Sequence, residues 1–366
     1  MNMRAKLLSI TALLLGMGVA AWGQRPNITN AKLQEVSGGP SLKATLASNT
    51  EKQSGPLWVG YRIPAQAKER SMCCWDSVNQ VRNGDKCCLG CRMDSERDSN
   101  FTGTSSNCAP PEPLPYAFLF LKYENHQVSR VRVFSNDCPL DFAGLPLFWL
   151  NDVKPEQSVE LLVPIAQSGS SEGEWSHRDV ASQAVMAIAF HDVTAADQAL
   201  QTLIQPNQPL RLREKVAFWL GVERGKPGLD TLRRAVKDDQ DERFREKATF
   251  AISQSKEPEA VKDLIDMAHH DPSSRVRGQA IFWLAQIGGR KEAAQITDAI
   301  ENDPDTDVKK KAVFALSQIR NGEGVPLLIS VARTNKNPAV RKQAIFWLGQ
   351  SNDPRALNYL EEILTK

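Results

Sequence analysis

Seven cysteines are the residues of this chain whose type and spacing could do chemistry, and all lie within one stretch. They are Cys73, Cys74, Cys87, Cys88, Cys91, Cys108 and Cys138. Clustered thiols can form disulfides, bind a zinc ion or cycle between reduced and oxidised forms. The compartment helps to decide between these, because disulfides persist in oxidising surroundings and are rare in the cytosol.

The N-terminal segment 1–23 indicates the compartment. A basic start precedes an apolar stretch at 7–21, and the small residues Ala21 and Gly23 stand just before Gln24. This order is typical of a secretory signal peptide, and the apolar stretch is short for a membrane span. We therefore expect residues 1–23 to be a cleaved signal. The mature protein is then exported, to a periplasm or beyond, without membrane insertion after cleavage.

Export makes disulfides the first interpretation of the cysteines, closing a long loop between strands. Because seven is odd, one thiol stays free or pairs between chains. Zinc is the second interpretation, with Cys88 and Cys91 as one C-x-x-C knuckle, although a second knuckle is missing. The residues available to a metal are Cys73, Cys74, Cys87, Cys88 and Cys91. A redox-active C-x-x-C is the third interpretation, and it lacks the βαβ setting of such motifs.

Strand patterns surround the cysteine cluster. They occur at 57–65, 116–123 and 128–135. Residues 118–121 are apolar on both faces, which predicts a central strand, while Arg130 and Arg132 alternate with valines and predict a solvent-facing side. We expect a small β-rich, cysteine-rich domain at 57–150, preceded by a polar leader or linker at 24–56.

The hexapeptide QAIFWL occurs at 279–284 and again at 343–348. The two copies span two units of a shorter repeat. A constant 32-residue step connects Phe218, Phe250, Phe282, Phe314 and Phe346. The same step connects Arg213, Arg245, Arg277, Lys309 and Arg341. About six units share this register, and each contains two apolar helical patterns. Because one helix pair cannot bury its apolar side alone, the pairs have to stack, and the sequence predicts an α-solenoid.

Residues at the helix ends support this division into pairs. Good N-caps stand at equivalent positions before the first helices: Asp241, Ser273, Asp305 and Asn337. Gly288 and Gly289 can end the first helix of one unit.

Residues 340–364, VRKQAIFWLGQSNDPRALNYLEEIL, resemble the HEAT-like repeats of the phycobilisome-lyase type. The shared features are the Val-Arg start, the alanine-containing first helix, Leu-Gly, and Asp-Pro-Arg-Ala-Leu leading into the second helix. The resemblance covers about 178–366, and it implies a HEAT-like solenoid, a fold that mostly serves as a binding scaffold. Phe-Trp stands here where the family commonly has small or polar residues. The HEAT-like iron hydroxylases use His-Glu dipeptides as ligands, and the chain contains none, so that activity is not implied.

The residue after each phenylalanine alternates between small and large. The series is Ala187, Trp219, Ala251, Trp283, Ala315 and Trp347. Such alternation lets successive layers of a dense core interdigitate, so we interpret the tryptophans as core residues. The phenylalanines lie at the flank of the buried stripe. They either pack on the adjacent unit, for example against Ile281 or Ile345, or form a partly exposed stripe for a partner.

The basic series leaves two similar alternatives. The side chains of Arg213, Arg245, Arg277 and Arg341 form a positive stripe for an acidic partner, or they pair with carboxylates in nearby turns. The nearby carboxylates are Asp239, Asp241 and Asp305. At a surface each such pair contributes little stability.

Composition and motifs together favour a non-catalytic protein. A length of 366 residues suits about two domains, and a net charge of +2 gives no reason to expect nucleic acid. The sequence offers no paired nucleophile and base and no cofactor loop, so we expect neither enzyme activity nor a cofactor. We expect an α+β chain with the solenoid at 153–366, acting as an exported scaffold for another envelope or secreted protein. The alternative is a metal- or thiol-based sensor or redox accessory centred on Cys73–Cys91, with the solenoid as its docking arm.

Overall fold

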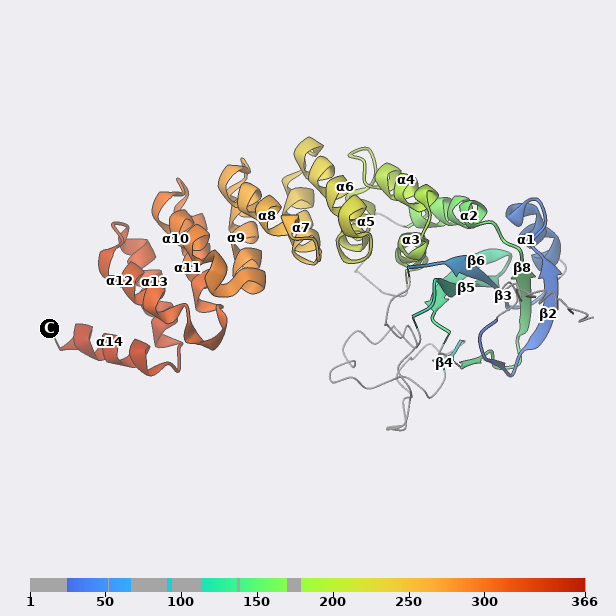
Figure 1. Ribbon diagram of the computed structural model, residues 1–366, viewed down its shortest axis with the longest axis horizontal. Helices are drawn as coiled ribbons and strands as arrows, with labels where there is room; N and C mark the ends of the chain where they lie inside the picture. The colour runs from blue at the N-terminus through green and yellow to red at the C-terminus, as the bar shows by residue number, and fades with distance from the viewer. Residues whose placement is uncertain are drawn as a thin grey trace, which may run out of the picture.

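The computed structural model describes residues 25–51, 53–66, 91–93, 113–136, 139–169 and 179–365. A sheet-containing N-terminal part leads into an arched array of helices (Figure 1). The expected signal peptide lies outside the described residues. So do Cys73, Cys74, Cys87, Cys88, Cys108 and Cys138, and only the backbone of Cys91 is described. The three interpretations of the cysteines therefore stay predictions.

Five strands form the main sheet, in the order β2-β8-β3-β5-β6. Their bounds are Lys32–Ser37 (β2), Pro146–Asn151 (β8), Leu57–Pro64 (β3), Tyr116–Glu124 (β5) and Gln127–Phe134 (β6). Strands β3, β5 and β6 are antiparallel, and β5 lies inside the sheet as its two apolar faces predict. The β5–β6 hairpin turns at Asn125 and His126, both with positive φ. A smaller ladder is formed by β1 (Ile28–Thr29), β7 (Leu140–Asp141) and β4 (Cys91–Arg92).

The segment expected to be a polar leader, 24–56, contains part of this domain. Strand β2 pairs in parallel with β8, and α1 (Leu42–Thr50) follows with Leu42 and Leu46 buried. The pattern misleads because β2 is an edge strand with mostly exposed side chains. Its partner β8 is far away along the chain, so local spacing gives no sign of the pairing.

Both faces of the main sheet are covered. One face packs on α2 (Pro155–Gln167) and α3 (Val180–Phe190), in a core that continues into the helical array. Aromatic residues dominate the core on the opposite face: Trp58, Phe118, Phe120, Phe134, Phe142 and Trp149. Arg132, expected at a solvent-facing side, lies there 5% exposed, with its guanidinium 4.9 Å from the Phe134 ring centroid. It is buried because residues 91–93 and 140–142 cover this face.

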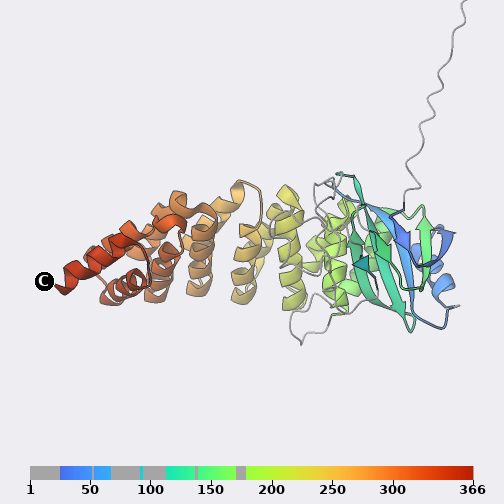
Figure 2. The same cartoon turned by 90° about the horizontal axis from the view of Figure 1, so that it is seen from below.

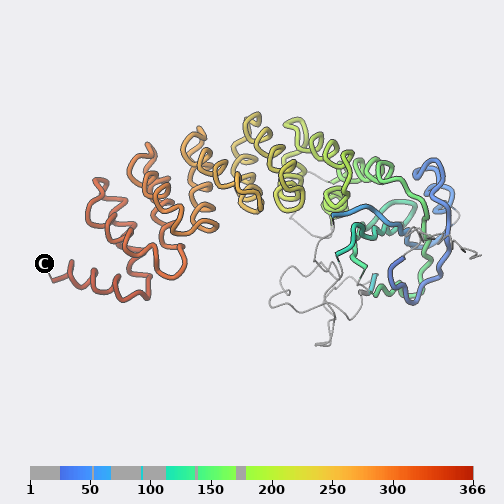
Figure 3. Tube along the Cα trace, viewed as in Figure 1, coloured from blue at the N-terminus to red at the C-terminus, as the bar shows by residue number. Residues whose placement is uncertain are grey.

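From α3 onward the helices follow one another in pairs. The pairs are α3 with α4 (Thr194–Leu203), α5 (Leu210–Glu223) with α6 (Gly225–Asp238), α7 (Glu242–Ser253) with α8 (Glu259–His270), α9 (Ser274–Gly288) with α10 (Ala293–Asn302), α11 (Thr306–Ser317) with α12 (Val325–Thr334), and α13 (Pro338–Gly349) with α14 (Pro354–Leu364). Helices α4, α6, α8, α10 and α12 follow the outer edge of the arch, and the first helices lie inside them (Figures 1 and 3). Among the described residues, no helix is both long and apolar enough to cross a membrane.

The predicted helix ends are largely confirmed. The side chains of Asp241, Asp305 and Asn337 accept backbone N–H groups at the starts of α7, α11 and α13. Ser273 precedes α9, but its side chain makes no capping hydrogen bond. Helix α9 ends at Gly288, and Gly289 follows it with a φ of 52°, a conformation that favours glycine.

Candidate interaction surface

The aromatic residues of the first helices form one continuous line of rings, which we call the aromatic ladder. In spatial order it consists of Phe190, Trp219, Phe218, Phe250, Trp283, Phe282, Phe314, Trp347 and Phe346. Neighbouring ring centroids lie between 4.8 and 6.0 Å apart. The ladder runs from α3 to α13, so it extends along the whole array.

Two kinds of ring contact alternate along the ladder. Phe282 stacks on Phe314 at 6.0 Å with the rings 5° from parallel, and Phe314 then packs on Trp347 at 4.8 Å with the rings tilted by 41°. The same two contacts occur earlier, between Phe218 and Phe250 and between Phe250 and Trp283. The residue after the phenylalanine decides which contact forms. Where the next unit carries alanine at this position, phenylalanine stacks on phenylalanine, and where it carries tryptophan, phenylalanine packs on the tryptophan at a tilt. Each aromatic pair stabilises the stack by roughly 0.5–1.5 kcal/mol beyond its buried area.

Much of the ladder is reachable from solvent. Phe346 is 53% exposed and Phe250 is 36% exposed, and the other ladder phenylalanines of α5, α9 and α11 are half-buried. Trp219 is buried, as predicted for a core residue, whereas Trp283 and Trp347 are half-buried. The two alternatives for the phenylalanines are thus both realised in part. The rings of Phe218, Phe250, Phe282 and Phe314 contact aromatic rings of the next unit, and all five phenylalanines keep part of their surface exposed to solvent.

Polar rows flank the ladder on both sides. Four residues after the phenylalanines stand Gln254, Gln286, Gln318 and Gln350, three of them exposed and Gln286 half-buried. One helical turn before the phenylalanines, the side chains are mostly basic. These residues are Lys247, Lys310, Lys311 and Lys342, together with the acidic Glu214 and Glu246. Glu246 pairs with Arg275 at 2.6 Å. The glutamine row was missed in the sequence analysis, although it shares the repeat step that identified the phenylalanines.

The arginine series is not a surface stripe. Arg213, Arg245 and Arg277 are only 4–8% exposed. Each pairs with an aspartate 26 residues later, and the three aspartates are Asp239, Asp271 and Asp303. The pairs of Arg245 and Arg277 are bidentate, with N–O distances of 2.8 and 3.0 Å.

Each pair fastens one unit to the next. Arg277 also donates to the backbone carbonyl of Asp271, and Asp303 also accepts the backbone N–H of Asp305 at 2.8 Å. The guanidinium therefore connects two successive turns between units. Two of the carboxylates expected from the sequence do lie beside Arg213. Asp239 forms the ion pair, and Asp241 Oδ2 lies 3.7 Å from the second guanidinium nitrogen of Arg213.

This burial removes three of the four arginine candidates from the binding surface. Their guanidinium groups are committed to the turns that join the units, so an acidic partner cannot reach them. Arg341 differs: it is half-buried and donates to the carbonyl oxygens of Asn335 and Lys336.

Comparison with known proteins agrees with this architecture. Residues 196–285 and 293–366 match the family model described as HEAT repeats. Residues 196–366 therefore contain HEAT repeats. No curated protein matched the chain in a sequence search.

Solved structures with helical repeats are similar at low identity. Human deoxyhypusine hydroxylase in complex with glycerol is 17% identical, over 57% of this chain and 89% of that chain, with a TM-score of 0.29. The Escherichia coli protein YibA is 22% identical, over 53% and 70%, with a TM-score of 0.35. The complex of CpcE and CpcF of phycocyanin lyase from Nostoc sp. is 14% identical, over 56% and 80%, with a TM-score of 0.28. Likenesses of this size carry no functional assignment.

A buried network joins the sheet to the HEAT array. His191, at the end of α3, donates from Nδ1 to the carbonyl of Ala187 at 2.7 Å. Its Nε2 therefore accepts from the Ser158 hydroxyl at 2.9 Å, and Ser158 Oγ accepts from the Tyr61 hydroxyl at 2.9 Å. Burial lowers the pKa of His191 to about 4 and raises the pKa of Tyr61.

The serine and histidine of this network resemble a nucleophile and its base, but their surroundings exclude catalysis. Tyr61, Ser158 and His191 are fully buried, so no substrate reaches the Ser158 hydroxyl. Arg224 adds to the same junction by donating to the His191 carbonyl at 2.6 Å. The network is therefore a structural connection between β3, α2 and α3.

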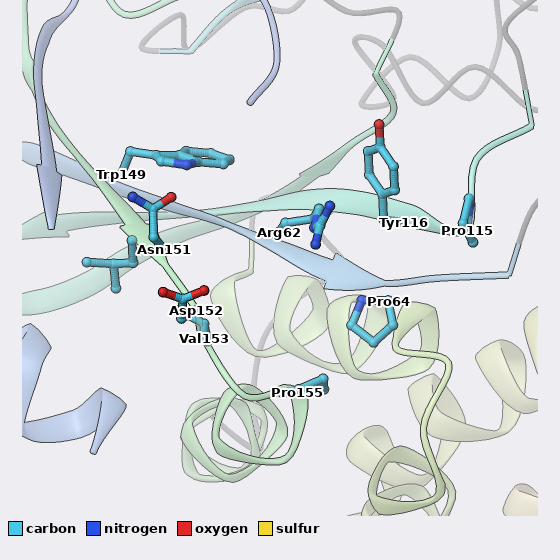
Figure 4. Close-up of a pocket in the computed structure, with 10 residues that line it drawn as sticks. Arg62, Pro64, Pro115, Tyr116, Trp149, Asn151, Asp152, Val153 and Pro155 are labelled. Carbon is cyan, nitrogen blue, oxygen red and sulfur yellow. The ribbon is translucent and has the colours of Figure 1, made fainter. Parts of the chain in front are cut away.

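A pocket of about 440 Å³ lies at the end of the sheet beside α2 (Figure 4). Arg62, Tyr116, Trp149, Asn151 and Asp152 contribute to its wall, and the Arg62 guanidinium lies 5.1 Å from the Tyr116 ring centroid. The described residues that line it include no histidine, cysteine, serine or lysine. The pocket has room for a small polar molecule, and Asp152 is the one carboxylate among the described residues that line it.

Proposed function

We propose that this chain is an exported, non-catalytic scaffold whose HEAT array binds another protein along the aromatic ladder. HEAT repeats generally mediate interactions between proteins, and the match to that family supports this class of function. The single observation that carries the proposal is the uninterrupted ladder from α3 to α13, in which Phe250 and Phe346 are exposed.

The chemistry of the ladder suits a protein partner. Aromatic side chains supply much of the energy of protein interfaces, because they bury large areas and lose little conformational freedom. The glutamine row adds amide donors and acceptors one turn away, at one residue per unit. A partner that lies along several units therefore meets the same apolar and polar groups repeatedly.

The charges on one side of the ladder favour a partner with acidic residues. Lys247, Lys311 and Lys342 are exposed there, while Glu246 is already paired with Arg275. The partner therefore carries an apolar stripe with acidic residues along one edge. Electrostatic complementarity of this kind mainly accelerates association and selects the partner.

Export rests on the N-terminal sequence. Under this proposal residues 1–23 direct secretion and the partner is a secreted or envelope protein. The cysteine-rich part is then stapled by disulfides in that oxidising compartment.

Capture of partners from the native host tests the proposal. The purified protein is immobilised and exposed to secreted and envelope proteins, and bound proteins are quantified by mass spectrometry. The double variant Phe250→Ala, Gln254→Ala should reduce capture of a specific partner at least about tenfold, which corresponds to about 1.4 kcal/mol. Lys256→Ala, an exposed change outside the ladder, is the matched control. Equal capture by both variants would refute the ladder as the binding surface.

A further inference from the structure

The pocket beside α2 collects side chains that three neighbouring strands place on one face of the main sheet (Figure 2). On β3, Arg62 and Pro64 lie on the same side as Trp58, a residue of the aromatic core, because side chains alternate along a strand. Tyr116 begins β5 opposite Pro64, and Asn151 ends β8. The pocket therefore continues the aromatic core at the ends of β3 and β8, which run in parallel there.

Arg62 gives the pocket a positive group. Its guanidinium lies in the middle of the pocket, with Asp152 on one side of it and Tyr116 on the other (Figure 4). The Cζ atom is 5.1 Å from the Tyr116 ring centroid, a cation–π contact that orients the guanidinium plane. A guanidinium presents its N–H donors in a fixed plane and can hold a carboxylate through two parallel hydrogen bonds. This side of the pocket therefore suits a carboxylate.

The opposite wall presents acceptors. Within the described residues, neither the Asp152 carboxylate nor the Asn151 carboxamide has a hydrogen-bond or ion-pair partner, and both line the pocket. Asp152 has a φ of 59°, an uncommon conformation that aspartate and asparagine tolerate better than most residues. Gly38 holds this turn, because its backbone N–H donates to the Asn151 carbonyl oxygen at 2.6 Å. A Cβ on Gly38 would lie 2.7 Å from that oxygen.

We propose that this pocket binds a small zwitterion, an α-amino acid or dipeptide with an apolar side chain. The ligand carboxylate pairs with Arg62, and the ligand ammonium group donates to Asp152 and to the side-chain oxygen of Asn151. Arg62 and Asp152 do not form an ion pair with each other, so the pocket presents a positive and a negative group at separate places. A zwitterion matches both groups at once.

The remaining lining and the size of the pocket agree with such a ligand. Apolar residues supply most of the other contacts, and a ligand side chain can pack on them. They are Pro64, Pro115, Leu150, Val153 and Pro155. The volume of about 440 Å³ falls within the usual range for small-molecule sites. A ligand with a carboxylate alone would meet Asp152 as a like charge, and one with an ammonium group alone would meet Arg62 as a like charge.

Calorimetric titration of the purified full chain tests the proposal. The probes are leucine, phenylalanine and the dipeptide Leu-Leu, and at least one of them should bind with a Kd below about 1 mM. Two analogues of leucine each lack one charge: N-acetyl-leucine has no ammonium group, and leucinamide has no carboxylate. Each analogue should bind at least about tenfold more weakly than the zwitterion. Comparison of leucine with Leu-Leu distinguishes a free amino acid from a short peptide as the ligand.

Two variants assign the charges to their residues. Asp152→Asn should weaken zwitterion binding at least about tenfold, and it keeps the backbone turn because asparagine tolerates the same φ. Arg62→Gln should weaken leucine binding but not leucinamide binding, a change in preference that general damage to the fold would not produce. Glu160→Gln removes an exposed carboxylate of α2 outside the pocket, so it is the matched control for Asp152→Asn and should bind like the parent. Because Asp152 is exposed, its variant keeps the test decisive even if Arg62→Gln fails to fold.

Three results would overturn the zwitterion site. The first is that none of the three probes binds at about 10 mM. The second is that N-acetyl-leucine or leucinamide binds as tightly as leucine, and the third is that Asp152→Asn binds as tightly as Glu160→Gln. None of these outcomes depends on the partner of the aromatic ladder, so the pocket and the proposed function can fail separately.

Discussion

Arg277 and Asp303 form a bidentate ion pair across 26 residues of sequence, and both side chains are more than nine-tenths buried. The pair joins the start of α9 to the turn after α10. It thereby connects one unit to the next through charge as well as through apolar packing. Removing one partner leaves the other charge buried without compensation.

Asp303→Ala should therefore destabilise the array by about 2–3 kcal/mol. This lies below the cost for a deep interior pair, because the array is only two helices thick and water is close. Arg243→Ala, which removes an exposed partner of Asp241, should cost less than about 1 kcal/mol. Urea unfolding followed by circular dichroism measures both. Similar losses for the two variants would show that burial of the Arg277 pair adds nothing.

Gly221 permits a close approach of α5 and α7. A Cβ at this position would lie 2.0 Å from the carbonyl oxygen of Ala251, a backbone atom that cannot move aside cheaply. Gly221→Ala should therefore cost about 2–3 kcal/mol of unfolding free energy. Gly349→Ala is the control at the same place in the repeat, because nothing lies within 4 Å of its Cβ. It should be neutral or stabilising by up to about 1 kcal/mol. Equal thermal melting temperatures for the two variants would contradict the close contact.

Acid should weaken the connection between sheet and array. The folded pKa of His191 is about 4, below its unfolded value of 6.5. Between these two values the unfolded chain binds a proton that the folded chain does not bind. The contribution of His191 is fully present above pH 6.5 and is lost as pH falls towards 4, by roughly 3 kcal/mol in total.

Replacement of the histidine isolates this effect. His191→Gln should be less stable than the parent at pH 7, and its stability should fall less between pH 7 and 4.5. His270→Gln, at an exposed histidine outside the buried network, is the control for replacing a histidine. Unfolding curves at the two pH values measure the difference, and an unchanged slope in His191→Gln would argue against the buried neutral imidazole.

The cysteines carry the last prediction. If the protein is exported as proposed, the purified protein should contain three disulfides, one free thiol and no bound metal, as expected for a stapled loop in an oxidising compartment. Thiol counting before and after reduction, together with metal analysis, measures this. Stoichiometric zinc, or reversible oxidation at Cys88 and Cys91, would instead favour the sensor or redox alternative.

The constant repeat step predicted much of the array because each unit repeats the same local chemistry. It placed the ladder phenylalanines on one helix face and identified the caps Asp241, Asp305 and Asn337, all of which the structure confirms. The stacking of one phenylalanine on another depends on how units pack, and single-helix periodicity does not contain that information.

Burial of charge was harder to anticipate. Charged residues are mostly exposed, so both interpretations of the arginine series, a positive stripe or pairs with nearby carboxylates, placed these side chains at the surface. A second series, Asp239, Asp271 and Asp303, recurs at the same step as the arginines and at a constant distance after them. The sequence analysis already named Asp239 as a partner, and aligning the two series extends the pairing to Asp271 and Asp303, but the burial of these pairs follows from the turns that close over them. The parallel pairing of β2 with β8 left no local signal at all, because its two strands are so far apart in sequence.

The alternation of tryptophan and alanine has a consequence for how such a protein can change in length. Loss of one unit would bring two tryptophan layers together, or two alanine layers, and leave either a clash or a void. Loss of two adjacent units would restore the original order of contacts. Duplications and deletions that survive in this array should therefore add or remove units in pairs, so that its evolutionary unit is twice its structural one.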